Sequence, residues 1–303
     1  MKAFGYEKHG APEVFQEYDV PEPTISADQV LIQTIAVGLN NRERAEWENG
    51  RSTTSPYIPG RDVVGEIVKV GDQVSDLSVG QTVMTHTEHG YAEYVVGDLD
   101  ATVVVSDGLT PTRAVGLITP GLTAYKAVKY FADVKPGQTV IVKGASGGVG
   151  SLSVQIATDL GAQVIGIASS HNEAYVKSIG AVKFVAYDQT DPAEELADTG
   201  DVVLNMAMNG AGTDDDIKMV KPNGVIASVA HQAPTTDKAL KFVHIFPTNA
   251  MTDREAMQAV IDLMRDGKLD IKIGYTLPFT RAGFVKGHQL LEEKHDGRVV
   301  IIK

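Results

Sequence analysis

The sequence contains no cysteine in its 303 residues. This absence excludes disulfide bonds, cysteine nucleophiles and thiolate-bound metal sites. It is in keeping with a reducing compartment, so we expect a cytoplasmic protein. We expect no signal peptide, because residues 1–6 lack an apolar stretch. No apolar run reaches the roughly 18 residues that a membrane helix needs.

Basic residues are also scarce relative to acidic ones. The 27 Lys and Arg residues face 39 Asp and Glu residues, which gives a formal net charge of −12. Such a surface repels phosphate backbones and anionic lipids. We therefore expect neither nucleic acid nor a membrane as the main partner. The chain is long enough for two domains with cores of their own.

Residues 1–118 are predicted to be rich in β-structure. Short β-branched runs recur there between turn signals that contain proline, glycine and aspartate. Regularly spaced short strands of this kind indicate a barrel or a sandwich. The expected strands are 29–35, 63–70, 81–84, 92–96 and 101–105.

From residue 119 the pattern changes to strands that alternate with helices. Apolar residues at helical spacing predict a helix over 122–131 and another over 149–160. Alternating strands and helices indicate a parallel sheet that is covered on both faces. The expected strands are 139–143, 163–168, 182–186, 201–204, 224–229 and 241–246. Towards the C-terminus we expect helices over 253–264, with Asp253 as N-cap, and 282–293, and a strand over 299–302.

A glycine-rich turn, Gly-Ala-Ser-Gly-Gly-Val-Gly, occupies residues 144–150 between a predicted strand and a predicted helix. In this context, backbone amides and the positive end of the helix dipole can hold a diphosphate. The first glycine of the usual G-x-G-x-x-G pattern is replaced here, so an ordinary strand-to-helix turn is the alternative. The residues predicted to contact the nucleotide are Ala145, Ser146, Gly147, Gly148, Val149 and Gly150.

The residues that follow the strand expected over 163–168 indicate which nucleotide binds. NAD-binding proteins place a carboxylate there, about twenty residues past the turn, on the ribose 2′-hydroxyl. This chain has Ser169, Ser170, His171 and Asn172 instead. Hydroxyl, imidazole and amide groups can hydrogen-bond a 2′-phosphate, so we predict NADPH. The alternative is that these side chains only solvate a loop, and Lys177 is expected to lie too far along the next helix.

Several segments together resemble one family over essentially the whole chain. They are 37–40, 59–65, 90–94, 121–125, 137–155 and 297–300. Their order and spacing are similar to the quinone oxidoreductase (zeta-crystallin-like) branch of the zinc-free medium-chain dehydrogenase/reductase superfamily. The resemblance implies a GroES-like β-barrel domain over 1–118, a Rossmann domain with a doubly wound parallel sheet over 119–252, and a return to the first domain over 253–303. It also implies an active site in the cleft between the domains, and a homodimer.

The resemblance implies roles for individual residues as well. Asn40 and Thr123 match positions beside the nicotinamide, and Tyr187 matches a phosphate-contact position. Tyr57 is a candidate proton donor. The ends of two later strands are expected to face the nucleotide, because ligands of open α/β sheets bind there: Asn205, Met206, Val229 and Ala230, with His231 next to them.

Structural interpretations of these residues stay open. Asn40 could instead occupy a turn, and Thr123 could provide a hydroxyl at the N-terminus of a helix. Tyr57 could belong to a loop that covers the barrel. Met206 and Val229 could pack in the core. The charged segment 42–47 borders the substrate pocket in the family, but we expect it to be solvated.

Zinc-dependent relatives carry a Cys ligand and a Gly-His-Glu segment, where this chain has Gly60, Arg61 and Asp62. The cluster over 86–89, His-Thr-Glu-His, is expected to face solvent, and we predict no metal.

These features predict an NADPH-dependent oxidoreductase that transfers hydride to quinones or related electrophilic carbonyl compounds. Such acceptors take hydride without a Lewis acid, provided that the protein positions them. One alternative is a reductase of enones or 2-alkenals. The other is a non-catalytic NADPH-binding protein with a structural or regulatory role.

Overall fold

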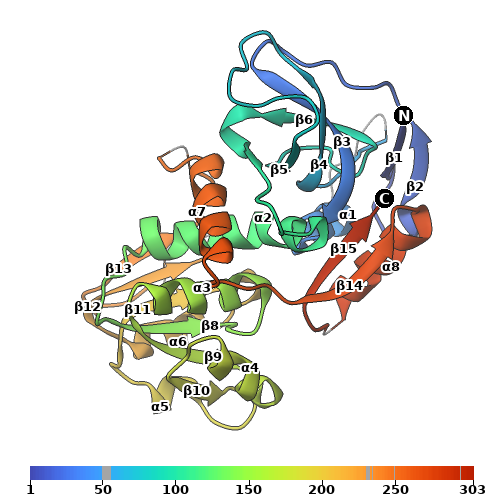
Figure 1. Ribbon diagram of the computed structural model, residues 1–303. Coiled ribbons are helices and arrows are strands. Elements are labelled where there is room, and N and C mark those ends of the chain that lie inside the picture. Colours follow the sequence, from blue (N-terminus) through green and yellow to red (C-terminus); the bar gives the residue numbers. More distant parts are fainter. Residues whose placement is uncertain (50–55, 230–232, 234, 249, 294) are drawn as a thin grey trace. The chain divides into compact units, whose positions relative to one another are not determined.

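The computed structural model describes residues 1–49, 56–229, 233, 235–248, 250–293 and 295–303 (Figure 1). The chain divides into two compact units. Unit 1 comprises residues 1–119, 252–261 and 271–303, and unit 2 comprises residues 120–251 and 262–270. The division falls within helix α2 (Pro111–Lys126) and within helix α7 (Asp253–Arg265).

Unit 1 contains a seven-stranded sheet with the order β14-β15-β3-β4-β5-β7, in which β6 also pairs with β3. Its pairs are antiparallel, except that β14 and β15 run parallel. The β-rich prediction for this part of the chain is confirmed. The strands are β3 (Gln29–Gly38), β4 (Asp62–Val70), β5 (Thr82–His86), β6 (Tyr94–Asp98), β7 (Thr102–Val104), β14 (Ile273–Pro278) and β15 (Arg298–Ile302).

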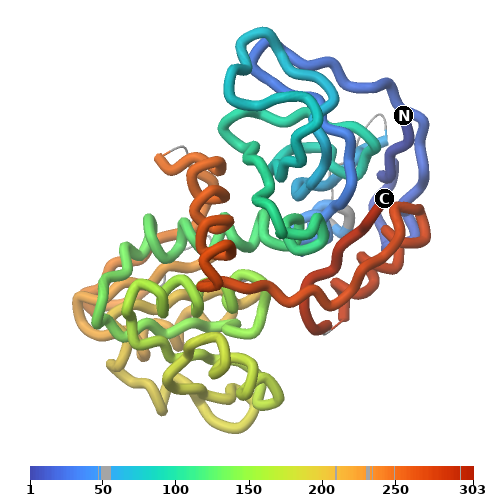
Figure 2. Tube along the Cα trace, in the orientation of Figure 1, coloured from blue at the N-terminus to red at the C-terminus, as the bar shows by residue number. Residues whose placement is uncertain are grey.

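The two ends of the chain meet in unit 1. Strand β15 pairs antiparallel with β3, with Ile301 opposite Val37, and the tube in Figure 2 shows this red strand beside the blue one. The rings of Phe4 and Phe284 have centroids 4.7 Å apart in the core. Phe284 lies on α8 (Arg281–Glu292), which packs on β14 and β15. The N-terminal hairpin of β1 (Lys2–Gly5) and β2 (Gln16–Asp19), strand β14, and helix α1 (Asn41–Asn49) were not predicted.

Unit 2 contains a six-stranded sheet with the order β10-β9-β8-β11-β12-β13. All its strands run parallel, and the order is that of a doubly wound sheet, so the predicted fold class is confirmed. Helix α3 (Gly148–Asp159) packs on β8 and β9, α4 (Glu173–Ser178) on β9 and β10, and α6 (Thr213–Met219) on β11 and β12. The strands are β8 (Thr139–Lys143), β9 (Gln163–Ala168), β10 (Lys183–Ala186), β11 (Gly200–Asn205), β12 (Val220–Ser228) and β13 (Lys241–His244).

The helix predicted over 122–131 begins at Pro111 instead. The sequence indicates a break at Pro120, because proline lacks an N–H and its ring crowds the preceding turn. The helix nevertheless continues, and the preceding amide is satisfied elsewhere: the N–H of Thr119 lies 3.2 Å from the Asp62 carboxylate, and its hydroxyl donates to the same group at 2.5 Å. The helix then passes into a π-turn, η3 (Ala127–Phe131).

The N-cap predicted at Asp253 is also wrong by one residue. Thr252 Oγ1 accepts the N–H of Glu255 at 3.1 Å, and Glu255 Oε2 accepts the N–H of Thr252 at 2.7 Å. This reciprocal pair is a capping box, which satisfies two amides at the start of α7. Among the helices of the described ranges, none has the length and hydropathy required to cross a bilayer.

The packing of α3 against the end of β8 requires a glycine at position 150. A Cβ built on Gly150 would lie 2.0 Å from the carbonyl oxygen of Gly144, which is far inside van der Waals contact. The clashing atom belongs to the backbone of a tight turn and has little freedom to move. The start of the helix can therefore approach the strand only because this residue has no side chain.

We expect Gly150→Ala to lower the free energy of unfolding of unit 2 by about 2 kcal/mol or more, because an added methyl group forces the backbone apart. Urea denaturation followed by circular dichroism measures this change. Gly147→Ala is the matched control, since its φ of −75° suits alanine and its Cβ would lie 3.3 Å from the same oxygen. We expect the control to cost about 1 kcal/mol or less. Equal losses in the two variants would contradict this account of the packing.

Candidate active site

The turn after β8 presents three backbone amides at the start of α3. Gly144 adopts φ +72°, and its carbonyl accepts the N–H of Gly147 at 3.0 Å, which closes the turn. Within the described residues, the N–H groups of Gly148, Val149 and Gly150 have no hydrogen-bond partner. Gly147, the N-cap residue, has no side chain that could satisfy them. Free amides and the positive end of a helix dipole suit an anionic diphosphate.

This turn lies where the strand order reverses. Strands β9 and β10 follow β8 on one side, whereas β11 lies on its other side. Ligands of open α/β sheets bind at the carboxyl ends of the strands at such a point. The loop after β11 is held close to the turn, because the N–H of Met206 donates to the carbonyl of Lys143 at 3.1 Å. Met206, predicted to contact the nucleotide, is half-buried there.

A buried ion pair anchors the loop after β11. Lys143 Nζ lies 2.7 Å from Asp216, and Asn205 Nδ2 donates to the other oxygen of that carboxylate at 2.6 Å. Burial raises the pKa of Asp216 to about 6, while Lys143 and Asn205 act in the opposite direction. The carboxylate is therefore ionised at pH 7. Asn205 is fully buried and its Oδ1 accepts the N–H of Ala207, so its amide fixes the loop.

The other predicted nucleotide residues of these loops are mostly positioned through their backbone. Ala145 is fully buried, and its N–H donates to Ile167 on β9 at 3.0 Å. Ser146 is half-buried at the turn. The N–H of Val229 donates to the carbonyl of Asn205 at 3.3 Å. Ala230 and His231 lie outside the described residues.

A carboxylate that the sequence analysis missed lies at the end of β9. Asp188 accepts the backbone N–H of Ser170 at 2.8 Å and its hydroxyl at 2.9 Å. Asp188 follows β10, the neighbouring strand, so residues near Ser170 in sequence give no sign of it. Tyr187 lies directly before it and is 53% exposed. Ser169 accepts the Asn172 amide at 3.0 Å, and that amide also lies 3.1 Å from His171 Nε2.

In unit 1, hydrogen bonds hold Asn40 on three sides at the start of α1. Its Nδ2 donates to Asp62 at 3.1 Å, and its Oδ1 accepts from Arg298 at 2.8 Å. Its backbone N–H donates to Glu43 at 2.9 Å, which is one half of a capping box. The spacing of Asn40 and Glu43 in the sequence is the signal that could have predicted this helix start. Asn40 is only 6% exposed.

A second set of ionic contacts surrounds Arg61. Its guanidinium lies 3.1 Å from Glu46 and 3.1 Å from Glu88. Glu46 also accepts the hydroxyl of Tyr57 at 3.2 Å. Burial and the nearby carboxylate raise the pKa of Tyr57 to about 12. The phenol therefore holds its proton firmly, which makes it a weak acid.

The prediction that segment 42–47 is solvated is wrong for Glu43. Its side chain is fully buried, 3.7 Å from Arg61, and its Oε1 forms no hydrogen bond within the described residues. Burial, reinforced by Asp62, raises the pKa of Glu43 to about 8. Helix α1 turns this side chain inward, because the capping contact requires Glu43 to reach back to Asn40. Burial therefore favours the neutral carboxyl of Glu43, while Arg61 acts in the opposite direction.

Thr123 lies on helix α2, and the residues of the cluster over 86–89 have different partners. Thr123 is half-buried in the fourth turn of α2, so the interpretation of it as the start of a helix is wrong. The cluster over 86–89 is divided among different partners: His86 contacts Asp253 at 2.7 Å, and His89 contacts the carbonyl of Ile58 at 2.8 Å. Across the described ranges, no group of three or more His, Asp and Glu residues could hold a metal ion.

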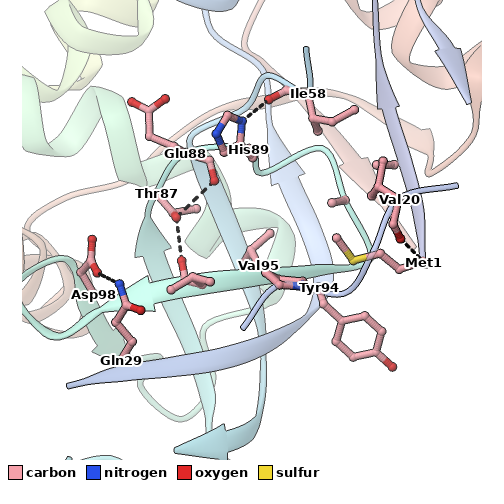
Figure 3. Close-up of a pocket in the computed structure, with 14 residues that line it drawn as sticks. Met1, Val20, Gln29, Ile58, Thr87, Glu88, His89, Tyr94, Val95 and Asp98 are labelled. Carbon is pink, nitrogen blue, oxygen red and sulfur yellow. Dashed lines mark hydrogen bonds between the residues drawn. The ribbon is translucent and has the colours of Figure 1, made fainter. Parts of the chain in front are cut away.

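A cavity of about 320 Å³ lies in unit 1, lined mainly by apolar atoms (Figure 3). Several of the polar groups around it are paired with one another. Thr87 donates to the carbonyl of Val96, Gln29 to Asp98, and the N-terminal ammonium of Met1 to the carbonyl of Val20. Its lining includes none of the residues predicted to act in catalysis, so we assign it no part in the reaction.

Two family models match the chain. The alcohol dehydrogenase GroES-like domain matches residues 26–129, and the zinc-binding dehydrogenase domain matches residues 148–266. The first match confirms the GroES-like part of the predicted fold.

Individual proteins are similar over most of the chain. The quinone oxidoreductase of Mus musculus is 31% identical over 77% of this chain and 74% of its own length. The 2-methylene-furan-3-one reductase of Solanum lycopersicum is 29% identical over 99% of this chain and 79% of its own length. A mycobacterial protein solved in complex with NADPH is 26% identical, superimposes with a TM-score of 0.85, and covers 100% of both chains.

The buried carboxyl of Glu43 generates a prediction about stability. Its pKa rises from an ordinary 4.5 to about 8 on folding, so folding takes up a proton. The stability from this proton is fully present below pH 4.5 and is lost as pH rises through about 8. Glu43→Gln removes this loss, because the neutral amide does not titrate. We expect the free energy of unfolding of the variant, relative to that of the wild type, to rise by up to about 1.4 kcal/mol per pH unit between pH 4.5 and about 8.

Urea denaturation of both proteins at several pH values between 5 and 8 measures the difference. Glu48→Gln, on the same helix but exposed and paired with Arg44, is the matched control. It should follow the pH dependence of the wild type. A constant difference between Glu43→Gln and the wild type across this range would show that Glu43 is ionised in the folded protein.

Proposed function

The chain belongs to the quinone oxidoreductase branch of the zinc-free medium-chain dehydrogenase/reductase superfamily, and we propose that it reduces quinones or related electrophilic carbonyl compounds with NADPH. Members of this family are oxidoreductases that depend on a pyridine nucleotide. The observation that carries the proposal is the turn after β8, where three free amides face the point at which the strand order reverses.

The residues present fit a dinucleotide. The amides of Gly148, Val149 and Gly150 would hold the diphosphate, and glycine at 147 leaves its approach clear of a side chain. Ser169, Ser170, His171 and Tyr187 would face the adenosine ribose, because they follow the ends of β9 and β10. Met206 and Val229 would border the nicotinamide half, since they follow β11 and β12. The bound nucleotide supplies a hydride to the acceptor.

Asn40 and Tyr57 in unit 1, and Thr123 in unit 2, are the candidates for catalysis that the family resemblance gives. Asn40 can keep one orientation, because Asp62 and Arg298 engage both ends of its amide. Its part is therefore to shape and position rather than to exchange a proton. The raised pKa of Tyr57 supports water or a nucleotide hydroxyl as the source of the proton. Thr123 offers a hydroxyl group from α2.

The names of the relatives support the proposed substrate class. The mouse relative is named for quinones, whereas the tomato relative is named for a 2-methylene-furan-3-one, which is an enone. Reduction of enones or 2-alkenals is therefore the second candidate. A homodimer stays a prediction of the family resemblance.

We expect the purified protein to oxidise NADPH in the presence of 1,4-benzoquinone or 9,10-phenanthrenequinone, and 2-alkenals test the second candidate. Loss of the nicotinamide absorbance measures the rate. Activity should survive treatment with a metal chelator, because charge on these acceptors is delocalised without a Lewis acid. Binding of NADPH without turnover of any acceptor would favour a non-catalytic protein. Loss of activity that a divalent ion restores would contradict the zinc-free mechanism.

We also expect NADPH to bind more tightly than NADH, because no carboxylate follows β9 directly and a structural relative binds NADPH. Ser170→Ala should weaken NADPH about tenfold and NADH less, because a bound 2′-phosphate would take over the hydroxyl that now donates to Asp188, and the variant lacks this donor. Titration of nicotinamide fluorescence gives both dissociation constants. Ser178→Ala is the matched control, because that hydroxyl donates to Tyr175 within α4. Equal losses for both nucleotides would mean that Ser170 does not face the 2′ position.

A further inference from the structure

The end of β9 carries a carboxylate that comes from the neighbouring strand. Strands β9 and β10 pair in parallel, with Ala168 opposite Ala186, so the residues that follow both strands emerge at the same edge of the sheet. Asp188 reaches across this edge to Ser170 and accepts both of its donors, the backbone N–H at 2.8 Å and the hydroxyl at 2.9 Å. These two residues are 18 positions apart in the sequence.

The place of this contact matters for nucleotide recognition. In doubly wound sheets, a carboxylate about twenty residues beyond the glycine turn accepts the ribose 2′-hydroxyl of NAD. Ser170 stands 20 residues after Gly150, at that position, and has no charge of its own. Asp188 therefore brings a carboxylate to the point where the sequence has none.

Within the described residues, the carboxylate of Asp188 has no lysine or arginine partner, and the nearby cationic side chain is the imidazole of His171. Hydrogen bonds from Ser170, the backbone one above all, lower the pKa of Asp188, so it is ionised at neutral pH. Lys177, the nearest lysine along the chain, donates to Glu173 at 2.6 Å. Across the described residues, no lysine or arginine forms an ion pair with Asp188. A 2′-phosphate here would meet a negative charge that no lysine or arginine offsets, and it would compete for the two donors that Asp188 already engages.

We infer that Asp188 is a specificity-determining residue, whose carboxylate weakens the binding of a nucleotide 2′-phosphate at Ser170 and can accept a free ribose 2′-hydroxyl. This inference rests on the proposed function, because it requires the dinucleotide to lie along the turn at 144–150. The carboxylate of Asp188 would make the preference for NADPH over NADH smaller than residues 169–172 alone predict. The same effect makes Asp188 the position at which the preference can be changed.

The test is Asp188→Asn, which keeps an acceptor for Ser170 but removes the charge. The measured quantity is the ratio of the dissociation constants of NADH and NADPH, from titration of nicotinamide fluorescence. We expect the ratio to rise about tenfold, chiefly because NADPH binds more tightly once the like charge is gone. Asp188 is exposed and follows the strand rather than lying in it, so the variant is expected to fold.

Glu194→Gln is the matched control, because it removes one negative charge from an exposed position of unit 2, and Ser170 donates to Asp188 rather than to Glu194. Its ratio should equal that of the wild type. A ratio for Asp188→Asn within twofold of the wild type, or a lower one, would overturn the inference even if both nucleotides bind. A wild type that binds neither nucleotide would instead overturn the proposed function, so the two failures are distinguishable.

Discussion

The close approach of α3 to the end of β8 is the constraint on which the rest of unit 2 depends. Because Gly150 has no side chain, the carbonyl of Gly144 can lie against the first turn of the helix. This packing places three free amides at the edge of the sheet rather than over its face. The same turn lies between β9 and β11, so both neighbouring strand ends become part of one site. One absent methyl group thus determines where an anion can bind.

Both units use buried charge to fix the loops that carry predicted site residues. In unit 2, Lys143 and Asp216 form an ion pair that Asn205 completes. In unit 1, Asp62 is fully buried and engages the amide of Asn40 and the hydroxyl of Thr119. Burying a carboxylate is costly unless several donors face it, and each of these carboxylates has them. These donors offset the cost of burial, and the same contacts hold the amides of Asn40 and Asn205 in one orientation.

Most features that depend on local sequence patterns were predicted, whereas features that depend on contacts between residues distant in the sequence were not. The strands of both sheets follow from apolar runs between turn signals, and the glycine turn follows from its place between a strand and a helix. Helix α2 was predicted too short, because the amide that Pro120 displaces is satisfied by Asp62, which is distant in sequence. Glu43 was expected in solvent, because its burial depends on contacts that close only in the fold. Local patterns therefore give the elements, and distant partners decide their ends and their polar contacts.

The contact between Ser170 and Asp188 shows why nucleotide preference is especially hard to predict from local sequence. The rule for doubly wound sheets examines the residues after the second strand, and there the chain has hydroxyl, imidazole and amide groups. In a parallel sheet, however, adjacent strands end at the same edge, so a position after one strand shares its surroundings with a position after the next. The electrostatic character of this edge is thus a property of the β9–β10 pair. Reading one strand end alone gives a neutral surface, whereas the folded edge is negative.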